Sequence, residues 1–285
     1  MVLNWALEAG KWQAAVRAVH PVTFPTAFKA VLSGLSFAVT TPNRVGEYLG
    51  RMLYMPHDKR LQIISLTLVC SFSQILLTGW CGLFAWLFLK QRLIQGGILP
   101  ASWWTAATAM LTVGNFILTA LYFQLPHLQQ RSQRWFQNKF YLHLARAVGF
   151  LTRSTQYKLL AFSALRYSVF LIQYVLLFRL FGVMAPVQQS AAATGLQFLA
   201  LAVMPTIALV ELGLRGQLGL LLMGLFTTNT VGVLFTLVGM WVINLVVPAT
   251  VGSLLLITVR LFTGAPHSMA KRAVPQIVKN QMAEV

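Results

Sequence analysis

Two pairs of oppositely charged residues share one spacing in a chain that carries few charges. In each pair a glutamate precedes an arginine by four residues, and a proline stands five or six residues before the glutamate. Side chains four residues apart lie on the same face of a helix and can form an ion pair. The sequence therefore predicts two matched ion pairs, Glu47 with Arg51 and Glu211 with Arg215.

These charged residues are candidates for holding a lipid headgroup. A guanidinium can bind a phosphate through two parallel hydrogen bonds, so Arg44, Arg51 and Arg215 are candidate ligands for a lipid phosphate. Glu47 and Glu211 would position these arginines or receive a cationic headgroup. The alternative is that each pair only locks a broken helix, and the two interpretations overlap because a locked pair can still line a lipid path.

The segments that carry these pairs belong to a membrane protein. The chain has 285 residues, of which 57% are hydrophobic and 9% are charged, and its mean hydropathy is +0.70. A soluble domain carries about 25% charged residues, so these charges are too few to cover a soluble surface. Basic cytoplasmic loops facing anionic lipid explain the formal net charge of +17 more simply than nucleic-acid binding does.

Four apolar stretches are long enough to cross a membrane, since about 20 helical residues span its hydrocarbon core. They are residues 61–89, 103–125, 159–183 and 231–260. Two further apolar segments, which carry the ion pairs, are interrupted and predict re-entrant or broken helices. The predicted breaks are Pro42 and Gly46 in the first segment, Pro205 in the second, and Asn244 with Pro248 in the last span. Asn244 is expected to hydrogen-bond to the backbone that Pro248 leaves free.

Residues 126–158 form a basic segment of a different character. It holds six basic residues and no acidic residue, while aromatic and aliphatic residues recur at three- and four-residue steps. This pattern predicts a cytoplasmic amphipathic helix that lies in the membrane interface, or else one that packs on the protein. We expect one transmembrane domain over residues 1–260 and a polar cytoplasmic tail over residues 261–285.

The two broken segments are predicted to face opposite sides of the membrane. Basic residues favour the cytoplasmic side, which places the ends of the first segment inside and those of the second outside. Two similar elements of opposite orientation indicate an inverted repeat, and transporters place substrate sites between such repeats. We therefore predict an all-α, polytopic membrane protein with a site between its two broken helices.

Three ordered stretches resemble those of a known family. Residues 40–51, 205–216 and 241–255 together look like the lysylphosphatidylglycerol synthase transmembrane-region family of flippase-like proteins, and the resemblance runs from about residue 24 to residue 260. It implies a polytopic inner-membrane protein with paired re-entrant helices around a lipid-accommodating cavity. Members are related to the lipid-translocating half of the enzyme that makes and flips lysyl-phosphatidylglycerol.

The chain departs from this family in two ways. Only about 25 residues follow the last span, so we expect no soluble aminoacyl-transferase domain and do not expect the chain to make the aminoacyl lipid. Family members usually have further spans before the first stretch, whereas only about 40 residues precede it here. We therefore expect either a truncated N-terminus or a start that is placed too late.

Catalytic and metal-binding motifs are not expected. The five histidines lie near segment ends without an HExxH pattern, Asp58 is the only aspartate, and no Walker A or GxGxxG loop occurs. Cys70 and Cys81 lie about 16 Å apart along a helix and cannot pair with each other. The sequence therefore predicts a chain that is not an enzyme and needs neither a metal nor a cofactor.

The predicted function is to bind or translocate a phospholipid or aminoacyl-lipid across the cytoplasmic (inner) membrane. One alternative is a non-transporting lipid-binding or scaffold subunit for a separate synthase or glycosyltransferase. A second alternative is a transporter of a small anion. The expected partners are anionic or zwitterionic membrane lipids, with a further copy of the chain or a separate lipid-modifying enzyme as possible protein partners.

Overall fold

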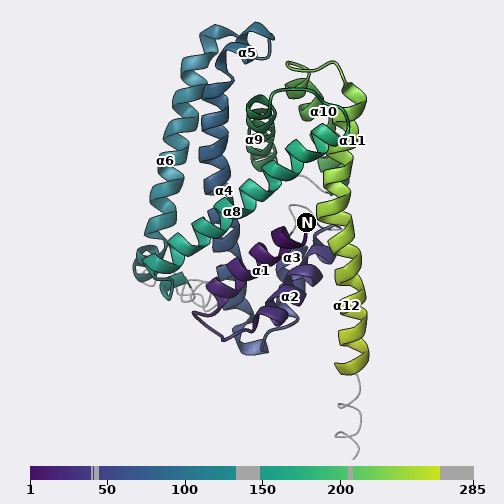
Figure 1. Ribbon diagram of the computed structural model, residues 1–285. Helices are drawn as coiled ribbons and strands as arrows, with labels where there is room; N and C mark the ends of the chain where they lie inside the picture. Colours follow the sequence, from purple (N-terminus) through teal and green to yellow (C-terminus); the bar gives the residue numbers. More distant parts are fainter. Residues whose placement is uncertain (40, 42–44, 133–147, 205–207, 264–285) are drawn as a thin grey trace, which may run out of the picture.

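Figure 1 shows the computed structural model of the chain, which describes residues 1–39, 41, 45–132, 148–204 and 208–263. These residues form helices joined by turns, and none of them lies in a β-strand. In chain order the elements are α1 (Val2–Val16), α2 (Phe24–Ala38), α3 (Gly46–Met52), η2 (His57–Lys59), α4 (Arg60–Phe88), α5 (Lys90–Gln95), α6 (Ala101–Ser132), α8 (Arg153–Leu180), α9 (Val187–Val203), α10 (Ala208–Met223), α11 (Thr230–Trp241), η3 (Val242–Val246) and α12 (Val247–Thr263).

Four continuous helical stretches are long and apolar enough to cross a membrane. They are His57–Phe88, Ala101–His127, Arg153–Leu180 and Thr230–Ile257. Each coincides with one of the spans predicted from the sequence, so the predicted all-α, polytopic membrane fold is confirmed. The remaining helices are shorter and pack among these spans.

The two predicted broken segments are pairs of helices. In the first hairpin, α2 and α3 pack closely, because a side chain at Gly50 would collide with the backbone of Ser33 and Gly34. Gly46 begins α3, where a Cβ atom would meet the carbonyl of Phe37, so this glycine permits a close turn. In the second hairpin, α9, which ends at Val203, and α10, which begins at Ala208, lie against each other.

The chain divides into two halves that repeat the same order of elements. The first half is α1–α4 and the second half is α8–α12; each consists of one helix, one hairpin and one long helix. In Figure 1, α4 runs from the end that holds the first hairpin towards α5, whereas α11 and α12 run in the opposite direction. This arrangement is that of an inverted repeat.

Contacts between the halves are reciprocal. α1 packs on α8, the first hairpin's α2 packs on α12, and the second hairpin's α9 packs on α4. Both hairpin contacts are made at a glycine: Gly252 of α12 lies against Leu32, and Gly82 of α4 lies against Leu199. The absence of a side chain at these glycines lets each hairpin approach the long helix of the other half.

The last span contains a π-helical turn, η3, which ends two residues before Pro248. π-helical turns and prolines both interrupt the regular hydrogen bonding of a helix, and both can bend it. The amide of Asn244 donates to the carbonyl oxygen of Met240 at 3.1 Å. Asn244 thus bonds to the main chain one turn before it, rather than at Pro248 itself.

The predicted amphipathic helix over 126–158 needs correction, and most of the predicted tail cannot be compared with the structure. The predicted amphipathic helix over 126–158 is not one element, because α6 continues to Ser132 and α8 already begins at Arg153. Its middle part, 133–147, and most of the predicted tail, 264–285, lie outside the described residues. The N-terminal helix α1 is buried against α2, α4 and α8.

Candidate functional site

A cavity of about 210 Å³ lies between the two halves. Its wall includes charged groups from four helices: Glu8 of α1, Glu47 of α3, Arg166 of α8 and Arg215 of α10. Apolar side chains, such as Val31 and those of α11, complete the lining. The cavity therefore joins one residue of each predicted ion pair with two charged residues that the pair spacing did not indicate.

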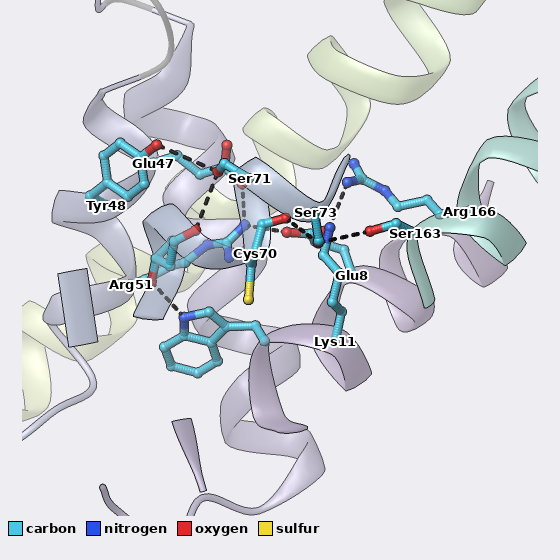
Figure 2. Close-up of polar contacts among 12 residues, drawn as sticks. Glu8, Lys11, Glu47, Tyr48, Arg51, Cys70, Ser71, Ser73, Ser163 and Arg166 are labelled. Atoms are coloured by element: carbon cyan, nitrogen blue, oxygen red, sulfur yellow. Dashed lines mark hydrogen bonds and ion pairs between the residues drawn. The ribbon is translucent and has the colours of Figure 1, made fainter. Parts of the chain in front are cut away.

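Glu8 is the centre of an ion-pair network that links the halves (Figure 2). One carboxylate oxygen accepts from Arg51 Nη2 at 2.8 Å, and the other accepts from Arg166 Nη1 at 2.6 Å. Lys11, one turn further along α1, lies 3.0 Å from the same second oxygen. Arg51 also pairs with Glu47, as its i,i+4 spacing predicts.

Three cations keep the Glu8 carboxyl ionised in this buried position. Burial alone would raise the pKa of Glu8. The positive charges of Arg166, Lys11 and Arg51 lower it by more than burial raises it, so the pKa lies below its ordinary value. A buried carboxylate persists only when it is paired and hydrogen-bonded, and Glu8 meets both conditions. The network is therefore charged at neutral pH.

Arg51 lies behind the cavity wall rather than on it. Its side chain is 2% exposed, and its guanidinium carbon lies 6.0 Å from the ring centre of Trp12. The Trp12 indole donates to Thr67 of α4 at 3.0 Å, which fixes the ring beneath the arginine. Arg51 thus ties α1 to α3 and makes no contact with the cavity.

Asn4 extends the network to the last span. Its side-chain oxygen accepts from Arg166 Nε at 2.9 Å, and its amide donates to Asn244 at 3.2 Å. The start of α1 therefore bridges α8 and the π-helical turn. All three of these residues line the cavity.

The second predicted ion pair also forms, but with different neighbours. Arg215 Nε donates to Glu211 at 3.0 Å, and Arg215 Nη1 donates to the hydroxyl of Tyr174 on α8 at 3.1 Å. Gln197 of α9 donates to the Arg215 carbonyl at 2.7 Å and so joins the two helices of the hairpin. The Arg215 side chain is 18% exposed and faces the cavity.

The predicted site residues are thus only partly brought together. Glu47 and Arg215 meet at the cavity, while Arg51 and Glu211 each pair with one of them. Arg44, Pro42 and Pro205 lie outside the described residues.

Sequence reasoning missed Glu8, Lys11, Asn4 and Arg166 as members of the site. Two signals pointed towards them: Glu8 is one of only five acidic residues, and Arg166 stands inside an apolar span. An ionisable residue within a span is a candidate functional residue by default. The described residues contain no group of three histidine, cysteine or acidic side chains that could hold a metal ion.

Comparisons with protein-family models, with curated proteins and with solved structures gave no match for this chain.

Proposed function

We propose that the chain binds the headgroup of a membrane lipid in the cavity between its two halves and moves the lipid across the membrane. The observation that carries this proposal is the position of the cavity, which is lined by charged residues of both halves of an inverted repeat. Membrane transporters commonly place their substrates between such repeats, beside broken helices.

The charges of the cavity support a functional role. Ionisable side chains at membrane depth are costly, and they usually mark a substrate path or a paired network. Here both features coincide, since Arg166 and Arg215 take part in ion pairs and also line the cavity. A lipid suits this setting because its headgroup is polar while its chains can stay among apolar helices. The resemblance to the flippase-like family points the same way.

The proposal is tested by reconstitution into vesicles that contain a fluorescent phospholipid. We expect the protein to expose inner-leaflet probe to an impermeant quencher faster than protein-free vesicles do. Arg215→Ala should slow this exposure, because it removes a cation from the cavity wall. The matched control is Arg179→Ala, which removes the same charge from an exposed position on α8.

Two results would overturn translocation. One is probe exposure no faster than in protein-free vesicles; the other is an equal rate for Arg215→Ala and Arg179→Ala. Lipid binding without any exposure would favour the non-transporting subunit instead.

A further inference from the structure

We propose that the cavity recognises a headgroup that carries hydroxyl groups, and that Gln74 and Thr78 of α4 hold these hydroxyls together with Glu47. This inference rests on the proposed lipid function and specifies its substrate class, a lipid whose headgroup is a polyol or a sugar. Two uncharged residues of an apolar span thereby gain a ligand-binding role, whereas such residues usually bond to a neighbouring helix or to their own backbone.

Thr78 differs from the other hydroxyl-bearing residues of α4 in having no partner. Ser65, Thr67, Ser71 and Ser73 each donate to a backbone carbonyl about one turn earlier in the helix. The Thr78 hydroxyl bonds to no described residue, although the residue is only 8% exposed. It is not one of the unpaired polar atoms that are closed off from solvent, and Thr78 lines the cavity. The hydroxyl therefore opens into the cavity.

Gln74 lies one turn before Thr78 and has no partner either. Side chains four residues apart share a helix face, and these two are about 6 Å apart along the helix axis. The Gln74 amide bonds to no described residue; its oxygen is closed off from solvent, whereas its nitrogen is not. Because Gln74 also lines the cavity, its Nε2 atom is a second open group on the same face of α4.

Glu47 brings a hydrogen-bond acceptor to the same wall. Its Oε1 atom accepts from Arg51, while Oε2 accepts from no described residue; the side chain is 20% exposed and lines the cavity. Tyr48, the next residue, lies with its hydroxyl 3.4 Å from that of Ser71 on α4, as Figure 2 shows. Ser71 precedes Gln74 by three residues, so this contact holds Glu47 beside the open face of α4.

The three open groups match a hydroxyl better than they match a phosphate or an ammonium group. A carboxylate oxygen only accepts hydrogen bonds, an amide nitrogen only donates them, and a threonine hydroxyl does both. A phosphate only accepts, and it would meet the like charge of Glu47. An ammonium group only donates, and it would find no acceptor in the amide nitrogen of Gln74. A headgroup with two or more hydroxyls can donate to Glu47 and accept from Gln74.

The cavity size fits the polar part of a lipid. At about 210 Å³, the cavity is smaller than the roughly 300–1,000 Å³ of pockets that enclose drug-sized ligands. A glycerol unit or a single sugar ring is a suitable occupant, whereas a whole lipid is not.

The test measures binding to the full chain by thermophoresis, in micelles of lauryldimethylamine oxide, a detergent without sugar or glycerol groups. Short-chain phosphatidylglycerol is compared with phosphatidylpropanol, which has the same charge and lacks the headgroup hydroxyls. Glucosyl-diacylglycerol is compared with diacylglycerol, which lacks the sugar. We expect the hydroxylated member of at least one pair to bind about tenfold or more tightly, the effect of two or more hydrogen bonds. The pair that shows this preference identifies the headgroup as a glycerol or a sugar.

Thr78→Val and Gln74→Leu keep the approximate shape of each side chain and remove its hydrogen-bonding group. Each should weaken binding of the preferred lipid by about three- to tenfold, the effect of one lost hydrogen bond, and leave the affinity for its hydroxyl-free counterpart unchanged. The matched controls are Thr112→Val, where the hydroxyl donates to the backbone of α6, and Gln91→Leu, at an exposed position of α5. Neither residue lines the cavity, so neither control should alter the preference.

Melting temperatures separate binding from folding. Neither Thr78→Val nor Gln74→Leu should lower the melting temperature, because the deleted groups have no partner among the described residues. A purely structural role predicts lower melting temperatures with an unchanged lipid preference, and that result would overturn the proposal. A preference for hydroxylated lipids that survives both substitutions would overturn it as well.

The remaining outcomes distinguish this inference from the proposed lipid function. Equal binding within both lipid pairs would overturn the hydroxyl site but leave a lipid-binding cavity. Binding of free glycerol or glucose, with the same dependence on Thr78 and Gln74 but without binding of any lipid, would support the hydroxyl site and overturn the lipid function. Binding of none of these probes would overturn both.

Discussion

The two halves of the molecule share their architecture but differ in how they compensate a buried arginine. In the first half, Arg51 is paired with two carboxylates, Glu8 and Glu47. In the second half, Arg215 is paired with one carboxylate and with the neutral hydroxyl of Tyr174. α1 and α8 are the equivalent first helices of the halves, so Tyr174 occupies the role that Glu8 has in the first half.

The two arginines also differ in their position relative to the cavity. Arg51 is enclosed and does not reach the cavity, whereas Arg215 is partly exposed and lines it. Two halves with the same order of elements can therefore differ in their arginines, one of which holds helices together while the other faces the cavity. Glu8 adds to the asymmetry because it also binds Arg166 across the interface of the halves.

The largest effect is expected from removing the carboxylate that the first half has and the second lacks. Glu8→Gln leaves Lys11, Arg51 and Arg166 without their common counter-charge in a buried position. Removing one partner of a buried ion pair costs about 3–5 kcal/mol of the free energy of unfolding. Thermal unfolding in detergent measures this loss. Asp58→Asn, which neutralises an exposed acid, should leave the unfolding temperature nearly unchanged.

The two halves can be compared directly by making the same substitution in each, Arg51→Gln and Arg215→Gln. We expect Arg51→Gln to lower the free energy of unfolding by about 3 kcal/mol, because it opens a buried ion-pair network. Arg215→Gln should lower it by only about 1–3 kcal/mol, the cost of hydrogen bonds to a partly exposed charged group. For the rate of lipid exposure in vesicles, measured on the folded protein, we expect Arg215→Gln to cause the larger loss and Arg51→Gln the smaller. Equal stability losses together with equal transport losses would contradict the division of roles.

How far the sequence alone predicts this structure depends on the range of each interaction. The four spans follow from apolar length, and the two ion pairs follow from i,i+4 spacing; both are local patterns. The contact of Arg166 with Glu8 joins residues 158 positions apart, and no local pattern encodes such a pairing. The same holds for the position of α1 inside the fold, because the buried carboxylate of Glu8 is paired with Arg51 and Arg166, which are distant in the sequence.

The reciprocal glycine contacts offer a further comparison of the halves. Gly252→Ala would press a methyl group against the carbonyl of Leu32, while Gly82→Ala would meet only the side chain of Leu199. Overpacking of this kind costs about 1–3 kcal/mol, and we expect Gly252→Ala at the upper end because backbone yields less than a side chain. Gly114→Ala, in α6, has open space around the new methyl group and is the control. Unfolding temperatures that rank Gly82→Ala as the more damaging change would contradict this packing.

The smallest effect is expected at Tyr174, the position where the second half departs from the first. Tyr174→Phe removes one hydrogen bond to Arg215 and should lower the free energy of unfolding by about 1 kcal/mol. Because the ion pair with Glu211 is kept, Arg215 should stay at the cavity wall, and lipid exposure should change little compared with Arg215→Gln. A loss of stability as large as that of Glu8→Gln would mean that the hydroxyl of Tyr174 contributes as much to the free energy of unfolding as the carboxylate of Glu8. The two halves would then be equivalent in energy as well as in architecture.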